Sequence, residues 1–237
     1  MRKRITSLLL TLVMLLSLVP AMGVTALAAS GDGTAESPRV VTTYDEWKAA
    51  MQQSNETYIK LGANIDTSTM YGGFGLGADE WIRVQTDIHL DLNGYKLTLL
   101  KSKISSGIYF IRVMTGSLTI EDSRSGGEIV GLNQVTSRYM QLIEVDKDAK
   151  LTLNSGRLHL ETNPDNDTPN ATIYFGGTVE INGGTVSISK FGRWDEVGSR
   201  ITQQNYALEA TGGNAVIKGG TLDGRVLLKA VAKASGV

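Results

Sequence analysis

The segment LDLNGYKLTL, residues 90–99, has leucine at its first, third, eighth and tenth positions and Asn-Gly between the two leucine pairs. Closely similar segments return as LTLNSGRLHL at 151–160 and VEINGGTVSI at 179–188. Apolar residues that alternate with polar ones are typical of a β-strand with one buried face. Asparagine and glycine favour a tight turn between two such strands. The repeated unit is therefore a strand, a sharp turn and a second strand.

A further apolar-polar-apolar triplet precedes each copy and extends the unit to three short strands. The triplets lie at 82–84, 111–113, 143–145, 173–175 and 208–210. The ten-residue cores begin at residues 90, 118, 151, 179 and 215, so their starts are 28, 33, 28 and 36 residues apart. Such a period without a helical segment predicts a solenoid of stacked β-coils. A propeller would need about four strands and roughly 40 residues in each blade.

This pattern, over residues 57–226, resembles the right-handed parallel β-helix of the pectin-lyase-like superfamily. In that family asparagines can stack at a sharp bend. Asn93, Asn154 and Asn182 occupy the matching bend here. Glu121 and Lys218 depart from it. The resemblance implies an all-β, right-handed parallel β-helix solenoid of about five coils. It does not decide an activity, because one scaffold of this kind hosts many functions.

The first 28 residues are interpreted as a bacterial secretory signal peptide. Basic residues at 2–4 precede an apolar run at 8–19, and the small residues around Ala28 suit cleavage. We therefore expect an exported protein, extracellular or at the cell surface, with no membrane insertion after cleavage. Residues 29–41 are expected to form a linker.

The N-terminal end of the β-helix is expected to carry a cap helix within residues 42–56. Tyr44, Trp47, Ala50 and Met51 recur there at helical spacing and would face the first coil. A cap is favoured over a partner-binding face because the open end of a solenoid must be covered.

Two interpretations remain for what covers the last coil at the C-terminal end. Residues 227–237 form a tail that could fold into a short cap, but no N-cap residue directly precedes it. The preferred interpretation is that further chain or a second copy of the protein covers the last coil, as in a homo-oligomer.

The composition excludes several partners and sites. A net charge of -1 gives no electrostatic reason to expect nucleic acid as a partner. The chain has no cysteine, so an exported protein must be stable without disulfides. His89 and His159 are seventy residues apart, which does not suit a zinc site. No cofactor is expected, although calcium remains possible.

Stacked coils should place equivalent outward residues in columns about 4.8 Å apart. One predicted column contains Arg83, Arg112, Glu144, Tyr174 and Glu209. It would pair Arg112 with Glu144 at the surface, and its alternative role is a basic groove for an acidic polysaccharide.

A second predicted column contains Asp91 and Glu180, three coils apart or roughly 14 Å. Glycoside hydrolases need two carboxylates within about 5 to 9.5 Å. Enzymes of the pectin-lyase-like superfamily use clustered acids or close aspartates, and the sequence predicts no such cluster on adjacent coils. No catalytic residue is therefore assigned.

The loop ETNPDNDTPN at 161–170 is a candidate for a metal site. Glu161, Asp165 and Asp167 could bind calcium through oxygen ligands. The alternative, which we favour, is a solvated turn.

The segment SKFGRWDEVGSRITQQNY at 189–206 contains an eight-residue insertion and is the main candidate for ligand binding. Its Phe191, Arg193, Trp194 and Asp195 combine aromatic faces with planar hydrogen-bonding groups, which suits a sugar ring. The alternative is a loop that folds its aromatic rings back onto the coil. MYGGFGLGADEW at 70–81 is a second candidate, and it lacks the ending of a phosphate-binding loop.

Three functions stay open at this point. The preferred one is a non-catalytic β-helix module at the cell surface that presents loops to polysaccharide or to a surface protein. The first alternative is a polysaccharide lyase or glycoside hydrolase, which rests on the fold resemblance. The second is a structural spacer of a longer surface protein.

Overall fold

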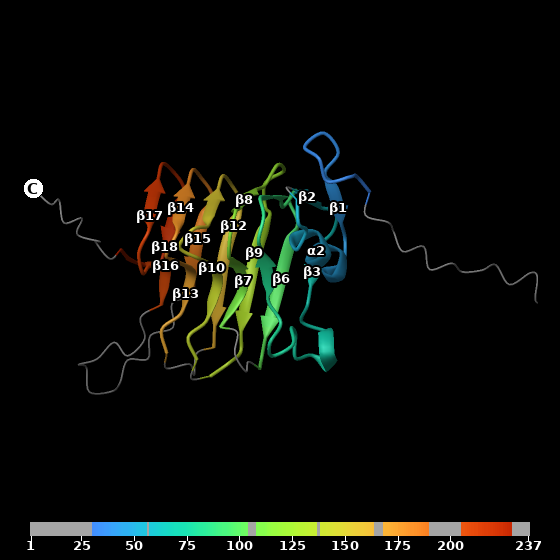
Figure 1. Cartoon of the computed structure of the whole chain (residues 1–237). Coiled ribbons are helices and arrows are strands. Elements are labelled where there is room, and N and C mark those ends of the chain that lie inside the picture. Colours follow the sequence, from blue (N-terminus) through green and yellow to red (C-terminus); the bar gives the residue numbers. More distant parts are fainter. Residues whose placement is uncertain are drawn as a thin grey trace, which may run out of the picture.

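The computed structural model describes residues 30–55, 57–103, 108–136, 138–163, 168–189 and 205–228. Its strands stack in parallel into three sheets around one core, which forms a long solenoid (Figure 1). The expected all-β, right-handed parallel β-helix is confirmed. No helix among the described residues has the length and apolar character to cross a membrane.

Each turn of the solenoid takes one strand from sheet A, one from sheet B and one from sheet C, in that order. Sheet A contains β1 (Arg39–Val41), β2 (Thr57–Leu61), β5 (Ile88–Asp91), β8 (Ser117–Glu121), β11 (Lys150–Leu153), β14 (Thr178–Ile181) and β17 (Asn214–Ile217). Sheet B contains β3 (Ile65–Asp66), β6 (Lys96–Lys101), β9 (Glu128–Asn133), β12 (Arg157–Thr162), β15 (Thr185–Ile188) and β18 (Thr221–Asp223). Sheet C contains β4 (Ile82–Val84), β7 (Tyr109–Val113), β10 (Gln141–Val145), β13 (Ala171–Phe175), β16 (Tyr206–Ala210) and β19 (Arg225–Leu227).

Four turns, from β5–β6–β7 to β14–β15–β16, have another turn stacked on both sides, and β2–β3–β4 and β17–β18–β19 form the two ends. This count agrees closely with the expected five coils. Inward residues of the four inner turns are almost fully buried and form one continuous apolar core. The alternation read from the sequence produces this core, because every second side chain of a strand faces the interior.

The register of the first repeat was predicted wrongly. Leu118 pairs with Ile88 instead of Leu90, so the first two cores are 30 residues apart (118 − 88) and not 28. The remaining cores stack as predicted. The interior column is Leu90, Ile120, Leu153, Ile181 and Ile217. Leu92, which the sequence placed in that column, is instead buried in the turn after β5.

The same shift affects one outward column and one asparagine. In the second outward column, His89 lies beside Thr119 of the next turn, whereas Asp91 lies beside Glu121. Asn182 Nδ2 donates to Asn154 Oδ1 at 2.9 Å, so these two residues form the expected asparagine stack. Asn93 lies outside it: its backbone is left-handed, with φ of 52°, and its Nδ2 donates to the Leu61 carbonyl at 2.8 Å.

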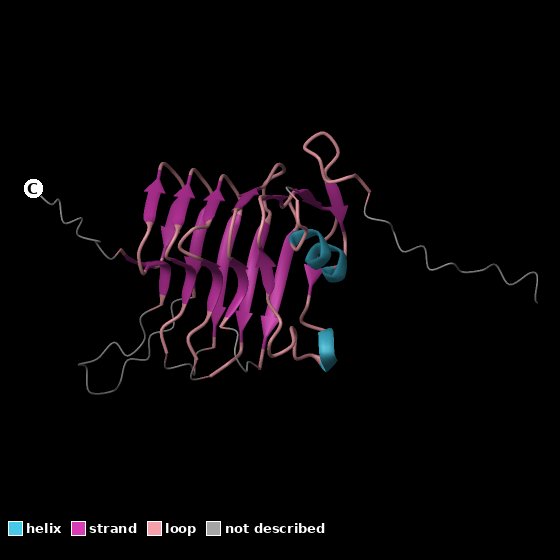
Figure 2. Ribbon diagram, viewed as in Figure 1, coloured by secondary structure: helices cyan, strands magenta, loops and turns pink. Residues whose placement is uncertain are grey.

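The predicted cap is present as helix α2 (Tyr44–Met51) (Figure 2). Thr43 accepts a hydrogen bond from the Glu46 N–H, and the Glu46 carboxylate accepts one from the Thr43 N–H in return. This capping box fixes where the helix begins. The residues predicted to face the first coil are all buried: Tyr44, Trp47, Ala50 and Met51. The helix ends earlier than the predicted segment, with Gln52 as its C-cap.

The last turn is far more exposed than the inner turns. Ile217, on the inward side of β17, is 47% exposed, and Val226 of β19 is 42% exposed. No strand or helix covers this end among the described residues, and the tail from residue 229 onward lies outside them.

Loop length varies mainly at one corner of the solenoid. The segments that join sheet B to sheet C are residues 67–81, 102–108, 134–140, 163–170 and 189–205. At the other two corners the longest connection in a full turn is 122–127. The described ends of these segments therefore lie along a single edge of the solenoid, which we call the loop edge (Figure 1).

Candidate functional site on sheet C

The outward face of sheet C runs beside the loop edge and carries the most distinctive surface chemistry of the described chain. Its central column is Arg83, Arg112, Glu144, Tyr174 and Glu209, in the predicted register. Aromatic side chains from the ends of the loops lie beside this column. We call the whole set the aromatic strip; its residues are Trp81, Arg83, Tyr109, Arg112, Tyr139, Glu144, Asp146, Tyr174 and Glu209.

The end of the strip near the cap helix combines aromatic rings with guanidinium groups. The Trp81 and Tyr109 rings meet edge to face, with centroids 5.3 Å apart. The Arg83 guanidinium lies 4.4 Å from the Trp81 centroid, and that of Arg112 lies 5.1 Å from the Tyr109 centroid. Such cation–π contacts stabilise the position of each guanidinium over its ring. Among the described residues Arg83 forms no ion pair.

Arg112 occupies the middle of the strip and is neutralised by two carboxylates. Its Nε donates to both carboxylate oxygens of Asp146, at 3.0 and 3.2 Å, and its Nη1 donates to the Tyr109 hydroxyl at 2.9 Å. Its Nη2 lies 3.9 Å from Glu144 Oε1. The predicted Arg112–Glu144 pair is thus present but is longer than the Arg112–Asp146 pair.

The far end of the strip carries two tyrosines and a glutamate. The Tyr139 and Tyr174 rings meet edge to face at 5.7 Å, and the Tyr139 hydroxyl donates to Glu209 Oε2 at 2.6 Å. Burial and this hydrogen bond raise the pKa of Tyr139 well above its ordinary value. Burial likewise raises the pKa of Tyr174. Both hydroxyls therefore remain neutral donors at physiological pH.

Glu144, a carboxyl group of the strip, has a raised pKa. Burial is the main cause, the nearby charge of Asp146 adds to it, and Arg112 opposes it. Burial alone would lower the pKa of Arg112, but hydrogen bonds to Asp146 and Tyr109 outweigh it and raise that pKa. The strip is therefore a half-buried surface of aromatic faces in which the charge of Arg112 is paired with those of Asp146 and Glu144.

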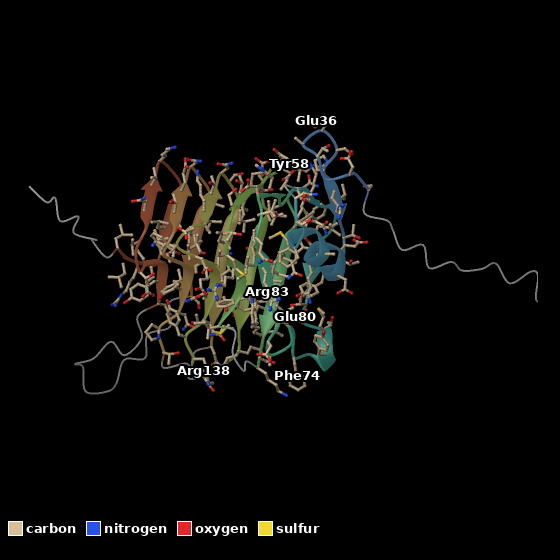
Figure 3. All side chains as sticks on the ribbon, viewed as in Figure 1. Glu36, Tyr58, Phe74, Glu80, Arg83 and Arg138 are labelled. Atoms are coloured by element: carbon tan, nitrogen blue, oxygen red, sulfur yellow. The ribbon has the colours of Figure 1, made fainter. Side chains whose placement is uncertain are left out.

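A hollow of about 400 Å³ adjoins the strip beside the cap helix. It is lined by Lys48, Gln52, Tyr71, Gly77, Asp79, Glu80, Trp81 and Arg83. Glu80 connects the loop to the cap helix, because it accepts hydrogen bonds from the Tyr44 hydroxyl and from Lys48 and pairs with the ammonium of Lys48. Figure 3 shows Glu80 and Arg83 close together on this part of the molecule.

The segment 70–81, proposed from the sequence as a second candidate, forms one wall of this hollow. Tyr71 has a left-handed backbone, with φ of 49°, and its side chain is 64% exposed. A non-glycine residue in this conformation is uncommon and is worth examining for function. The indole Nε1 of Trp81 is buried and has no hydrogen-bond partner among the described residues.

The main predicted ligand residues, Phe191, Arg193, Trp194 and Asp195, lie outside the described residues, as do Asp165 and Asp167. Glu161 is described: it lies near the end of β12 on the outer face of sheet B, beside a shallow hollow of about 370 Å³ that also contains Asp66 and Lys96. Among the described residues no three acidic or histidine side chains gather as a possible metal site.

The structure nevertheless relates the two predicted loops. Both leave the solenoid at the loop edge, on adjacent turns, because 163–170 follows β12 and 189–205 follows β15. The base of the second loop is held closed, since Asn205 Nδ2 donates to the Ser189 carbonyl at 3.2 Å.

The residues that support this edge were missed in the sequence. Asn133, Asn170 and Asn205 form an internal amide chain, with Nδ2 to Oδ1 distances of 3.2 Å at each step. Asn170 also accepts from the Met140 N–H, so the chain fixes the points where the long loops rejoin sheet C. The signal that could have found them is an asparagine at the boundary of a strand: Asn133 ends β9, and Asn170 and Asn205 directly precede β13 and β16.

Comparison of the chain with family models, with curated proteins and with solved structures gives no match.

Proposed function

We propose that the protein is a secreted, non-catalytic β-helix module of the pectin-lyase-like type that binds glycans through the aromatic strip. The observation that carries this proposal is the pairing of aromatic faces with fixed hydrogen-bonding groups along sheet C. A sugar ring has an apolar C–H face and a polar rim, which such a surface can contact together.

The charges of the strip favour a neutral glycan over an acidic one. Arg112 is neutralised by Asp146 and Glu144, which leaves Arg83 as the single cation of the strip without a carboxylate partner among the described residues. A basic groove for an acidic polysaccharide would need several such cations. The hydrogen bonds of the strip also support binding over catalysis. The Asp146 carboxylate accepts from Arg112 and that of Glu209 accepts from the Tyr139 hydroxyl, so neither carboxylate is free to act on a substrate.

One observation favours a glycoside hydrolase as the second candidate. The raised pKa of Glu144 is the property that a general acid needs, and Asp146 lies two residues further along the chain. This candidate requires turnover: a glycan would be shortened by the chain, and Glu144→Gln would abolish that activity. Binding without shortening supports the module.

The test is binding of the full chain to an array of defined oligosaccharides, followed by titration of the best glycan. Trp81→Ala and Tyr174→Ala should each weaken binding by about 1 kcal/mol or more, which is fivefold or more, without loss of folding. Tyr58→Ala is the matched control, because Tyr58 stacks on His89 at 4.1 Å on the outward side of sheet A.

Trp194→Ala is titrated with the same glycan. Weaker binding by this variant would add the segment 189–206 to the glycan site, and unchanged affinity would exclude it. If no glycan on the array binds, or if only Tyr58→Ala weakens binding, sheet C is not a glycan site. In the first case the spacer role becomes the better account.

A further inference from the structure

Lys101 is the one lysine of the described chain that lies inside the solenoid. It ends β6 on the inward side, its side chain is fully buried, and its Nζ donates to the Tyr109 carbonyl at 3.0 Å. The Phe110 ring, also fully buried, lies 5.9 Å from the same nitrogen. A buried ammonium is costly in such surroundings, so this residue requires a physical account.

The residue stacked on Lys101 in the next turn is Asn133, which is 3% exposed. Paired residues on neighbouring strands lie about 4.8 Å apart in the direction of stacking. The side chain of lysine is longer than this spacing, so rotation about its side-chain bonds can bring the amine to the carboxamide of Asn133 within the interior.

We propose that Lys101 and Asn133 form a covalent amide cross-link between adjacent turns of the solenoid. The Lys101 amine attacks Cγ of Asn133, a bond between Nζ and Cγ forms, and a proton passes from Nζ to Nδ2. The bond between Cγ and Nδ2 then breaks and one ammonia leaves. The step is balanced without oxidant, reductant or cofactor, because an amine and a primary amide give a secondary amide and ammonia.

The surroundings of both groups favour this chemistry. Burial lowers the pKa of Lys101 to about 8, although the charges of Glu80 and Asp79 oppose the shift. Roughly a tenth of the amine is therefore neutral, and hence nucleophilic, at pH 7, far more than for an exposed lysine. Asn133 Oδ1 accepts the Val135 N–H at 2.8 Å, and this donor would stabilise the negative charge that develops on that oxygen.

The carboxamide is also held in one orientation. Asn133 Nδ2 donates to Asn170 Oδ1 at 3.2 Å, which fixes which atom is oxygen and which is nitrogen. The Lys101 amine donates to the Tyr109 carbonyl in this structure, so it must turn from that carbonyl to reach the fixed carboxamide. Confinement of both groups in a closed interior then lowers the barrier to their reaction. The chain has no cysteine, so an amide of this kind is a covalent link that its composition permits.

The experiment is peptide mapping of the purified full chain after tryptic digestion under denaturing conditions. The expected product joins residues 97–103 to residues 125–138, lacks the mass of one ammonia, and is not cleaved after Lys101. Fragmentation of the peptide locates the bond. The mass of the intact chain does not suffice to identify the cross-link, because Asn93-Gly94 could also lose one ammonia by forming a cyclic imide.

Lys101→Met and Asn133→Ala should each abolish the linked peptide. Gln134→Ala is the matched control: Gln134 adjoins Asn133, is exposed, and should leave the link in place. Recovery of the separate 97–101 and 125–138 peptides from the native chain, with no linked species, would overturn the proposal even if a variant fails to fold. This inference does not depend on the proposed function.

Discussion

The partly buried carboxyl group of Glu144 shows how the surroundings of a single residue change its pKa. It lies between Arg112 and Tyr174 in the column of sheet C, and burial raises its pKa above the ordinary value of 4.5. The folded protein therefore holds this proton more tightly than the unfolded chain does. As pH rises from about the ordinary pKa through the raised one, the folded state loses stability relative to the unfolded state.

Replacement of Glu144 by glutamine should remove this dependence. We expect the free energy of unfolding of Glu144→Gln, relative to that of the native chain, to increase as pH rises from about 4 to about 7. Urea unfolding at several pH values measures the difference. If the difference in free energy of unfolding between the two proteins does not change with pH, the pKa of Glu144 is the same in the folded and the unfolded chain.

A strand contributes to the core through alternate side chains, and its register is testable at one position. Leu153 of β11 is fully buried in the column between Ile120 and Ile181. Leu153→Asp places an unpaired charge there and should lower the free energy of unfolding by more than about 3 kcal/mol. Thr152→Asp, on the outward side of the same strand, is the control. Equal melting temperatures for the two variants would contradict the inward register.

The strands themselves were predictable from the sequence, whereas the turn lengths between them were not. Ile88, Leu90 and Leu92 alternate without a break, so nothing in the sequence decides which two pair with the next strand. The turn from Leu90 to Leu97 is two residues longer than that from Leu153 to Leu158. A shift of two residues preserves which side chains face inward, so the core was predicted correctly despite the wrong register.

The candidate site was predictable only in part, for a related reason. The column through Arg112 and Glu144 follows from the repeat alone and is confirmed. Trp81, Tyr109 and Tyr139 lie at the ends of long connections, where no alternation indicates the direction of a side chain. The aromatic strip therefore became visible only when the fold brought these ends together.

At the scale of the whole molecule, the two ends of the solenoid differ. Helix α2 covers the first turn, whereas the last turn leaves Ile217 and Val226 exposed among the described residues. An exposed apolar end with free strand edges favours association with another chain. We therefore expect light scattering of the purified chain to increase with concentration beyond that of a monomer.

The double variant Ile217→Lys/Val226→Lys should reduce this association, because each change places a charge at the exposed end. Val216→Lys is the control, since Val216 points outward from β17 and is already exposed. A chain that remains monomeric, and that associates only after deletion of 229–237, would show that the tail itself covers the end.

The contrast between the three corners has a consequence for how this protein can change. Insertions at the loop edge, between 134 and 140 for example, lie outside the ladders that connect one turn to the next. Their length can drift over generations, or be set by grafting a foreign peptide, while the register of every strand is kept. Surface chemistry and backbone architecture are thereby inherited almost independently of one another.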